Sequence, residues 1–166
     1  MSRAGYNDDY GDDDPLVAGR WRAAVRSAMR GKRGQAFLRE ALAALDAMPD
    51  KRLVREHLLF DGWQPVWSGQ EVIVGGDELV DSAGVVMPIG SVCLLGAVGK
   101  ARGMDLSGLD PEDMDTVAPA FGIADAMARE LVYWNDECGD RGETPEQRWQ
   151  RMRLWVEKQI KKPTEA

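Results

Sequence analysis

Few side chains in this sequence are suited to covalent chemistry. Cysteine occurs at Cys93 and Cys138, and His57 is the single histidine. Cys93 lies near the expected start of a helix, where backbone N–H groups and the helix dipole lower the pKa of a thiol. A cysteine hydrolase built from this chain would use Cys93 as nucleophile and His57 as base, with Asp136, Asn135 or Asp77 as the group that orients the base.

A packing role for Cys93 competes with this interpretation. Free cysteine is among the most buried residue types, and the expected helix is apolar nearly all round. The residues that make it so are Val92, Leu94, Leu95, Ala97 and Val98. The spacing of Cys93, His57 and Asp136 does not indicate that they converge. We therefore assign no catalytic residue and expect Cys93 to mark a close helix contact at Gly96 and Ala97.

Metal and cofactor sites are not expected from the motifs. One histidine and two cysteines outside a C-x-x-C pattern do not make a zinc site. The glycines around Gly96 precede neither a phosphate-binding helix start nor a Lys-Ser/Thr pair, so they are not a P-loop. The prediction is therefore no metal and no cofactor.

Charge is strongly segregated along the chain, although the net charge is −7. Segments 1–14, 15–60, 61–140 and 141–166 carry −4, +6, −12 and +3. Such alternation arises either because the fold pairs opposite charges or because a basic face and an acidic face meet different partners.

The basic face is the best candidate for nucleic-acid binding. Five basic residues share one helical face or extend it: Arg22, Arg26, Arg30, Lys32 and Arg33. Phosphate contacts from such a face are geometrically possible. An isoelectric point near 4.8 disfavours DNA binding unless the acidic residues face away.

The elements that position these residues are mainly helical. Apolar residues at intervals of three and four predict five or six helices, near residues 15–30, 35–48, 92–102, 111–121, 123–136 and 145–160. The short link between the first two predicts an antiparallel pair. Ser91 is expected to cap the third, and Thr144 to form a capping box with Gln147 in the last. Glycines and β-branched runs predict a small β hairpin or meander insert around residues 60–90.

The chain has the size of a single domain. Residues 1–14 lack aliphatic side chains and predict a disordered acidic tail, followed by one globular domain over 15–162. No apolar run has the length of a membrane span, and residues 1–10 are unlike a secretory signal. We expect a cytoplasmic protein with reduced thiols and no membrane contact. The oligomeric state is left open.

Four blocks of sequence resemble small uncharacterised proteins of bacteriophages and prophages of proteobacteria. They are residues 31–40, 92–97, 133–137 and 143–149. The cysteine-to-Gly-Ala and Trp-Asn-Asp blocks are also similar to those of a wider bacterial family of unknown function. There the cysteine block commonly reads Cys-Ala-Leu-Gly-Ala, and Leu94 stands in place of the first alanine. The resemblance implies a phage accessory protein made in the bacterial host cytoplasm.

This context and the acidic segment together suggest a non-enzymatic partner-binding protein. The acidic span 105–140 would dock onto a basic, nucleic-acid-binding surface of a host or phage protein complex, for example one that acts in host defence. The acids expected to bind the partner are Asp105, Asp110, Glu112, Asp113 and Asp115. The alternatives are the cysteine hydrolase and nucleic-acid binding by the basic face.

Overall fold

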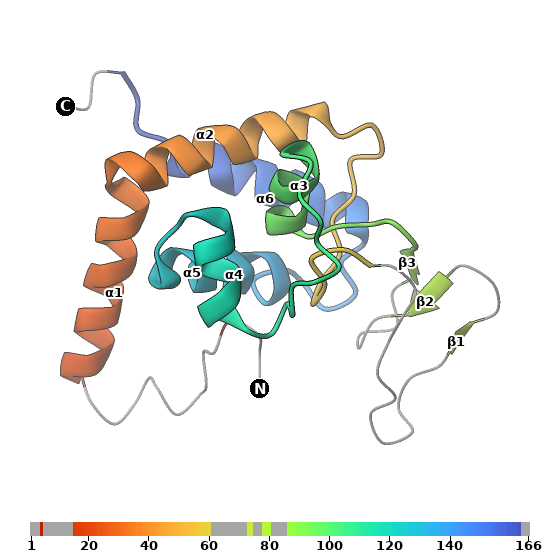
Figure 1. Cartoon of the computed structure of the whole chain (residues 1–166), viewed down its shortest axis with the longest axis horizontal. Coiled ribbons are helices and arrows are strands. Elements are labelled where there is room, and N and C mark those ends of the chain that lie inside the picture. The colour runs from red at the N-terminus through yellow and green to blue at the C-terminus, as the bar shows by residue number, and fades with distance from the viewer. Residues whose placement is uncertain (1–3, 5–14, 61–72, 75–77, 81–85, 164–166) are drawn as a thin grey trace.

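The computed structural model is mainly helical, as the apolar periodicity predicts. It describes residues 4, 15–60, 73–74, 78–80 and 86–163 (Figure 1). Within these residues the helices are α1 (Pro15–Arg30), α2 (Lys32–Ala47), α3 (Leu94–Ala101), α4 (Met114–Phe121), α5 (Asp125–Asp136) and α6 (Pro145–Gln159). None of these helices is both long and apolar enough to cross a membrane.

Three short strands occupy part of the expected insert: β1 (Ile73–Val74), β2 (Glu78–Val80) and β3 (Val86–Pro88). They pair antiparallel in the order β1-β2-β3, with Leu79 opposite both Ile73 and Met87. Residues 61–72, 75–77 and 81–85 lie outside the described residues. The hairpin or meander over 60–90 as a whole therefore stays a prediction.

The predicted tail, residues 1–14, also lies outside the described residues, except for Ala4. Ala4 is buried, and its carbonyl oxygen accepts a hydrogen bond of 3.3 Å from Arg129 of α5. This contact places one point of the N-terminal segment against α5.

The prediction that the first two helices form an antiparallel pair is wrong. Gly31 alone separates α1 from α2, because α2 begins at Lys32 rather than after Gly34. With one linking residue the chain turns sharply, and α1 crosses the end of α2 and packs on α5 (Figure 1). The last turn of α1 then covers Gly34, where a Cβ atom would overlap the carbonyl oxygen of Ala28.

The apolar stripe of α1 is buried only toward its C-terminal end. Met29 is buried, and Val25 and Ala28 pack partly against the core. Leu16 at the other end is 72% exposed, and Val17 is also exposed. The helical period of the stripe therefore predicts the helix correctly but overstates how much of it faces the core.

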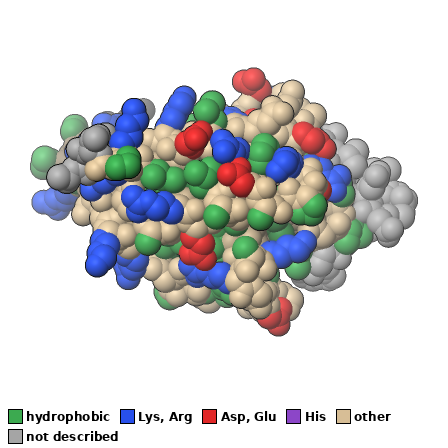
Figure 2. Space-filling view, turned by 90° about the horizontal axis from the view of Figure 1, so that it is seen from above, with side chains coloured by type: hydrophobic (Ala, Val, Ile, Leu, Met, Phe, Trp, Pro, Cys, Tyr) green, Lys and Arg blue, Asp and Glu red, His purple; other side chains and the backbone are tan. Residues whose placement is uncertain are grey.

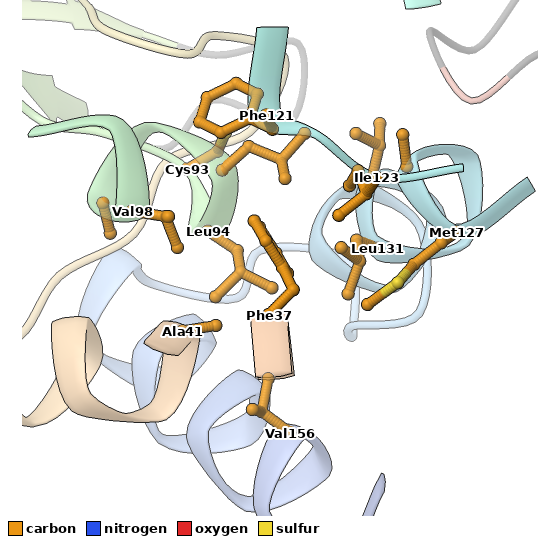
Figure 3. Packing of buried hydrophobic residues seen from close by; sticks show 14 of the residues in the cluster. Phe37, Ala41, Cys93, Leu94, Val98, Phe121, Ile123, Met127, Leu131 and Val156 are labelled. Atoms are coloured by element: carbon orange, nitrogen blue, oxygen red, sulfur yellow. The ribbon is translucent and has the colours of Figure 1, made fainter. Parts of the chain in front are cut away.

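The core lies where α2 meets α3 and α6, with α4 and α5 closing the other side. Figure 3 shows Phe37, Leu94, Phe121, Leu131 and Val156, one from each of these five helices, around a common centre. Phe37 and Phe121 pack edge to face with their ring centroids 6.4 Å apart. Each fully buried side chain of this size stabilises the fold by about 1.5–3 kcal/mol relative to an exposed one.

Helix α3 begins later than expected, and Ser91 does not cap it. Residues 91 and 92 are extended: Phe60 N–H donates to the Ser91 carbonyl (2.8 Å), and Val92 forms an isolated antiparallel bridge with Leu59. Cys93 is the N-cap instead. The pairing with the preceding segment, residues 53–60, decides this boundary, and a local sequence pattern does not contain that information.

The capping box of α6 is confirmed. Gln147 N–H donates to the Thr144 hydroxyl (3.2 Å), and Thr144 N–H donates to the Gln147 side chain (2.9 Å). Pro145 occupies the first turn, where a missing N–H costs nothing. The box fixes the start of a helix that packs on α2 and α5.

Candidate functional site

The structure places Cys93 in the core rather than at a surface. Its side chain is 1% exposed, and its Sγ accepts a hydrogen bond of 3.5 Å from Gly96 N–H. Figure 3 shows it among the apolar side chains of the cluster. In this state the sulfur serves as a helix cap and is closed to a substrate, which supports the packing interpretation.

His57 and Asp136 do not assemble with Cys93 into a catalytic triad. The His57 ring lies edge to face against Phe60 at 5.3 Å, and its Nδ1 is 3.0 Å from the Arg55 carbonyl oxygen. Asp136 Oδ1 accepts from Glu56 N–H at 3.2 Å. In the part of the chain that the structure describes, neither residue is hydrogen-bonded to the Cys93 sulfur.

The Asn135-Asp136 pair holds three segments together. Asn135 is 1% exposed, and its Oδ1 accepts from Leu94 N–H (3.1 Å) at the start of α3. Its Nδ2 donates to the Val54 carbonyl (2.9 Å) and to Asp136 Oδ1 (2.8 Å). A buried amide satisfied in this way fixes the relative position of α5, α3 and the segment 53–60.

The expected close contact at Gly96 is real, but its partner is not a helix. A Cβ atom on Gly96 would overlap the carbonyl oxygen of Leu58, in the segment that pairs with Val92. Gly99 instead faces the side chains of Leu106 and Phe121, the second from α4. Small residues of α3 therefore admit a backbone segment on one side and an aromatic ring on another.

Alkylation should separate the two cysteines. We expect iodoacetamide to modify Cys138, which is half-buried, and to modify Cys93 only in urea. Burial raises the pKa of the Cys138 thiol above its usual value, so its thiolate fraction near pH 7 is small. Its alkylation rate should keep rising above about pH 9. Mass spectrometry of the folded protein checks this, and Cys93 reacting as fast as Cys138 would contradict its burial.

The basic residues of α1 and α2 gather at one end of the molecule. Arg22, Arg26, Arg30, Lys32 and Arg33 are all exposed. Figure 2 shows several Lys and Arg side chains at the end where α1 lies, without Asp or Glu beside them, whereas over the rest of this face basic and acidic side chains are mixed. The bend between α1 and α2 brings the two sets together at a single corner.

Gln35 joins a third basic segment to this corner. Its Nε2 donates to the carbonyls of Met29 (2.8 Å) and Gln159 (3.0 Å), and its Oε1 accepts from Lys161 N–H (2.8 Å). The end of α6 is thereby fixed beside the start of α2.

We call the resulting surface the basic corner. Its members come from three segments of the chain: Arg22, Arg26, Arg30, Lys32, Arg33, Lys158, Lys161 and Lys162. The last three lie outside the basic face that the sequence predicts.

Most of these cations have no acidic partner. Across residues 15–60 and 86–163, no ion pair is formed by Arg22, Arg26, Lys32, Arg33 or the three lysines. By contrast, Arg153 at the middle of α6 is paired with Asp46 at 2.6 Å. Like charges held close together repel one another, so this surface is suited to an anionic partner.

The predicted acidic residues are exposed and hold their own turns together. Asp105 accepts from Ser107 (2.6 Å and 3.0 Å), Asp110 from Glu112 N–H (2.9 Å) and Asp113 from the Thr116 hydroxyl (2.7 Å). The donors are neutral, so these hydrogen bonds bring no positive charge next to the carboxylates.

The remaining two predicted acids lie beside them. Glu112 is exposed, and Asp115 lies 3.8 Å from Arg129. The hydrogen bonds from Ser107 hold the pKa of Asp105 below its usual value. The five acids therefore form an exposed, negatively charged surface around the start of α4.

Comparison with known protein families, curated proteins and solved structures finds no match to this chain. The geometry of its own surfaces is therefore the basis on which a function is proposed.

Proposed function

We propose that the protein is a non-enzymatic binding protein, made in a bacterium as a phage or prophage accessory protein, whose basic corner binds the phosphate backbone of nucleic acid. The observation that carries this proposal is the convergence of α1, α2 and the C-terminal end of α6 into one basic surface, most of whose cations form no ion pair with an acid of the described residues. Backbone phosphates are the partner that such a surface fits best, because each contact releases condensed counterions.

The bend between α1 and α2 suits the corner to a curved polyanion. Arg22, Arg26 and Arg30 are spaced four residues apart and so follow one side of α1 over about 12 Å. Lys32 and Arg33 continue the row around the corner. Cations spread over this length can contact several phosphates along one strand, which gives affinity without reading base sequence.

The negative net charge does not oppose this mode of binding at short range. The Debye length is about 8 Å at physiological ionic strength, so distant carboxylates are screened. Asp105, Asp110 and Asp113 lie at the loop before α4, outside the basic corner. The acidic remainder of the surface therefore lowers long-range attraction more than it lowers contact affinity.

Charge reversal tests the proposal. Arg26→Glu should weaken binding to a labelled DNA duplex about tenfold or more, because it removes one phosphate contact and adds repulsion. The measurement is fluorescence anisotropy at low salt. Lys100→Glu is the matched control: it makes the same charge change on α3 at an exposed side chain, and should leave affinity within about twofold.

Two results would reject nucleic-acid binding: no anisotropy change at low salt, or equal losses in Arg26→Glu and Lys100→Glu. Retention of the wild-type protein on an immobilised lysine-rich polypeptide, lost on Asp110→Asn/Asp113→Asn, would then favour the second candidate function.

That second candidate is docking of the acidic surface onto a basic partner. It is favoured by the neutral donors that bind Asp105, Asp110 and Asp113, since these donors bring no positive charge to offset the acidic surface. Such a surface would compete with nucleic acid for a host or phage protein complex, including a defence complex.

A further inference from the structure

A pocket of about 350 Å³ lies at the opposite end of α6 from the basic corner. It forms where the end of α5, the loop after it and the first turns of α6 meet the segment 53–60. The residues that line it are Arg55, Asp136, Glu137, Gly139, Asp140, Arg141 and Arg148. It is the polar site next to the Asn135-Asp136 pair, and Cys93 does not line it.

Arg148 is an unusual lining residue because its cationic side chain is buried. Its side chain is 3% exposed, and Nη1 donates to the Leu53 carbonyl at 3.2 Å. Nε lies 3.2 Å from Glu143 Oε1, but its N–H is not directed at that oxygen and has no hydrogen-bond acceptor. Burial lowers the pKa of Arg148, and the Glu143 carboxylate opposes this effect.

Arg55, which also lines the pocket, presents the same deficit. Its Nε is buried and also has no acceptor, and its Nη2 is 3.6 Å from Glu56, a distance too long for a strong ion pair. Buried donors without acceptors are costly, and native structures keep few of them. Both arginines line the pocket, so their guanidinium groups place two cations with unused hydrogen-bonding capacity beside it.

The acids nearest to these arginines are already engaged. Glu143 accepts from Arg151 Nε (2.7 Å) and Nη2 (3.0 Å). Asp136 Oδ1 accepts from Asn135 and from Glu56 N–H. Glu137 and Asp140 also line the pocket and are exposed, and their charges would oppose an anion.

We propose that this pocket binds a small oxyanion, a phosphate or a carboxylate, through Arg55 and Arg148. Guanidinium groups bind both anions with paired, charge-assisted hydrogen bonds, and Arg55 and Arg148 both line the pocket. Arg141 on the rim adds a third cation. The site is separate from the basic corner, which includes the other end of α6. The rise of the helix from Arg148 to Lys158 and the residues after it is about 16 Å.

Titration with inorganic phosphate and, separately, with acetate tests the site and identifies the preferred anion. Each is added at constant ionic strength, with sodium chloride replaced, and binding is measured by calorimetry. Wild-type protein should bind one anion per chain, and the binding heat should saturate by an anion concentration of about 10 mM. Arg55→Gln should weaken binding about tenfold, the cost of losing a charged hydrogen bond. Arg39→Gln, which removes an exposed cation of α2 outside both the pocket and the basic corner, should have no effect.

Asp140→Asn provides a gain of function that does not depend on the stability of an arginine variant. Removing the opposing rim charge should tighten anion binding by about threefold to tenfold. The proposal is overturned if no saturable heat is seen with either anion, or if Arg39→Gln weakens binding as much as Arg55→Gln does. It is also overturned if Asp140→Asn leaves affinity unchanged. Failure here leaves nucleic-acid binding at the basic corner untouched.

Discussion

Gly96→Ala should destabilise the protein by about 3 kcal/mol or more. A Cβ atom at this position would overlap the Leu58 carbonyl oxygen and lie 2.8 Å from its carbon. Neither partner can withdraw easily, because Val54 N–H donates to the Val92 carbonyl at 2.9 Å and Leu59 is bridged to Val92. The gain in helix propensity from alanine, about 1 kcal/mol, is too small to compensate.

Urea unfolding followed by circular dichroism measures this loss, and Gly19→Ala is its matched control. Gly19 is an exposed helical glycine of α1, and a Cβ atom there would meet no neighbouring atom of the described residues within 4 Å. Alanine there should stabilise the protein by about 0.5–1 kcal/mol. A Gly96→Ala variant as stable as the wild type would show that the segment 53–60 does not lie against α3.

Asn135→Ala should cost about 3–4 kcal/mol, the second largest effect expected of a single substitution. The change removes three hydrogen bonds and leaves Leu94 N–H and the Val54 carbonyl buried without partners. It also removes a donor from Asp136. Buried polar groups that lose their partners carry a desolvation penalty that an exposed group does not.

The control for Asn135→Ala is Gln150→Ala, which removes an exposed amide of α6. It should change the free energy of unfolding by less than about 0.5 kcal/mol. If Asn135→Ala fell within about 1 kcal/mol of wild type in the same urea titration, the amide would not be the link between α5, α3 and the segment 53–60.

Local signals predict most of the helices. The capping box at Thr144, the left-handed Gly122 that ends α4, and the apolar stripes of α2 and α5 all act within a few residues. Such elements are decided by propensity and periodicity, and the sequence contains both. The start of α3 and the angle between α1 and α2 depend on pairing with distant segments, so the local pattern places them incorrectly.

Three polar residues at core positions are signals that apolar periodicity alone does not use. Gln35 lies in the stripe of α2 with Leu38 and Leu45, Asn135 in the stripe of α5, and Arg148 in that of α6. A polar side chain at a buried position needs a partner, which is often distant in sequence. Gln35 lies at the basic corner, Asn135 links α5 to α3 and the segment 53–60, and Arg148 lines the pocket at the start of α6.

The candidate site is predictable only in part. The basic residues from Arg22 to Arg33 are close in sequence, and their helical spacing shows that they share a face. The contribution of Lys158, Lys161 and Lys162 depends on Gln35, which binds a backbone group 126 positions away. Charge segregation along the chain gives the sign of each segment, and only the fold decides which segments become neighbours.

The salt dependence of DNA binding tests the basic corner most directly, because its slope counts phosphate contacts. Each contact contributes about −0.9 to the slope of log K against log salt concentration on duplex DNA. Lys161→Gln/Lys162→Gln should make the slope less negative by about 0.9 to 1.8, although these residues are remote in sequence from Arg33. A slope equal to that of the wild type, or no binding at low salt, would contradict a surface built from α1, α2 and the C-terminal end of α6.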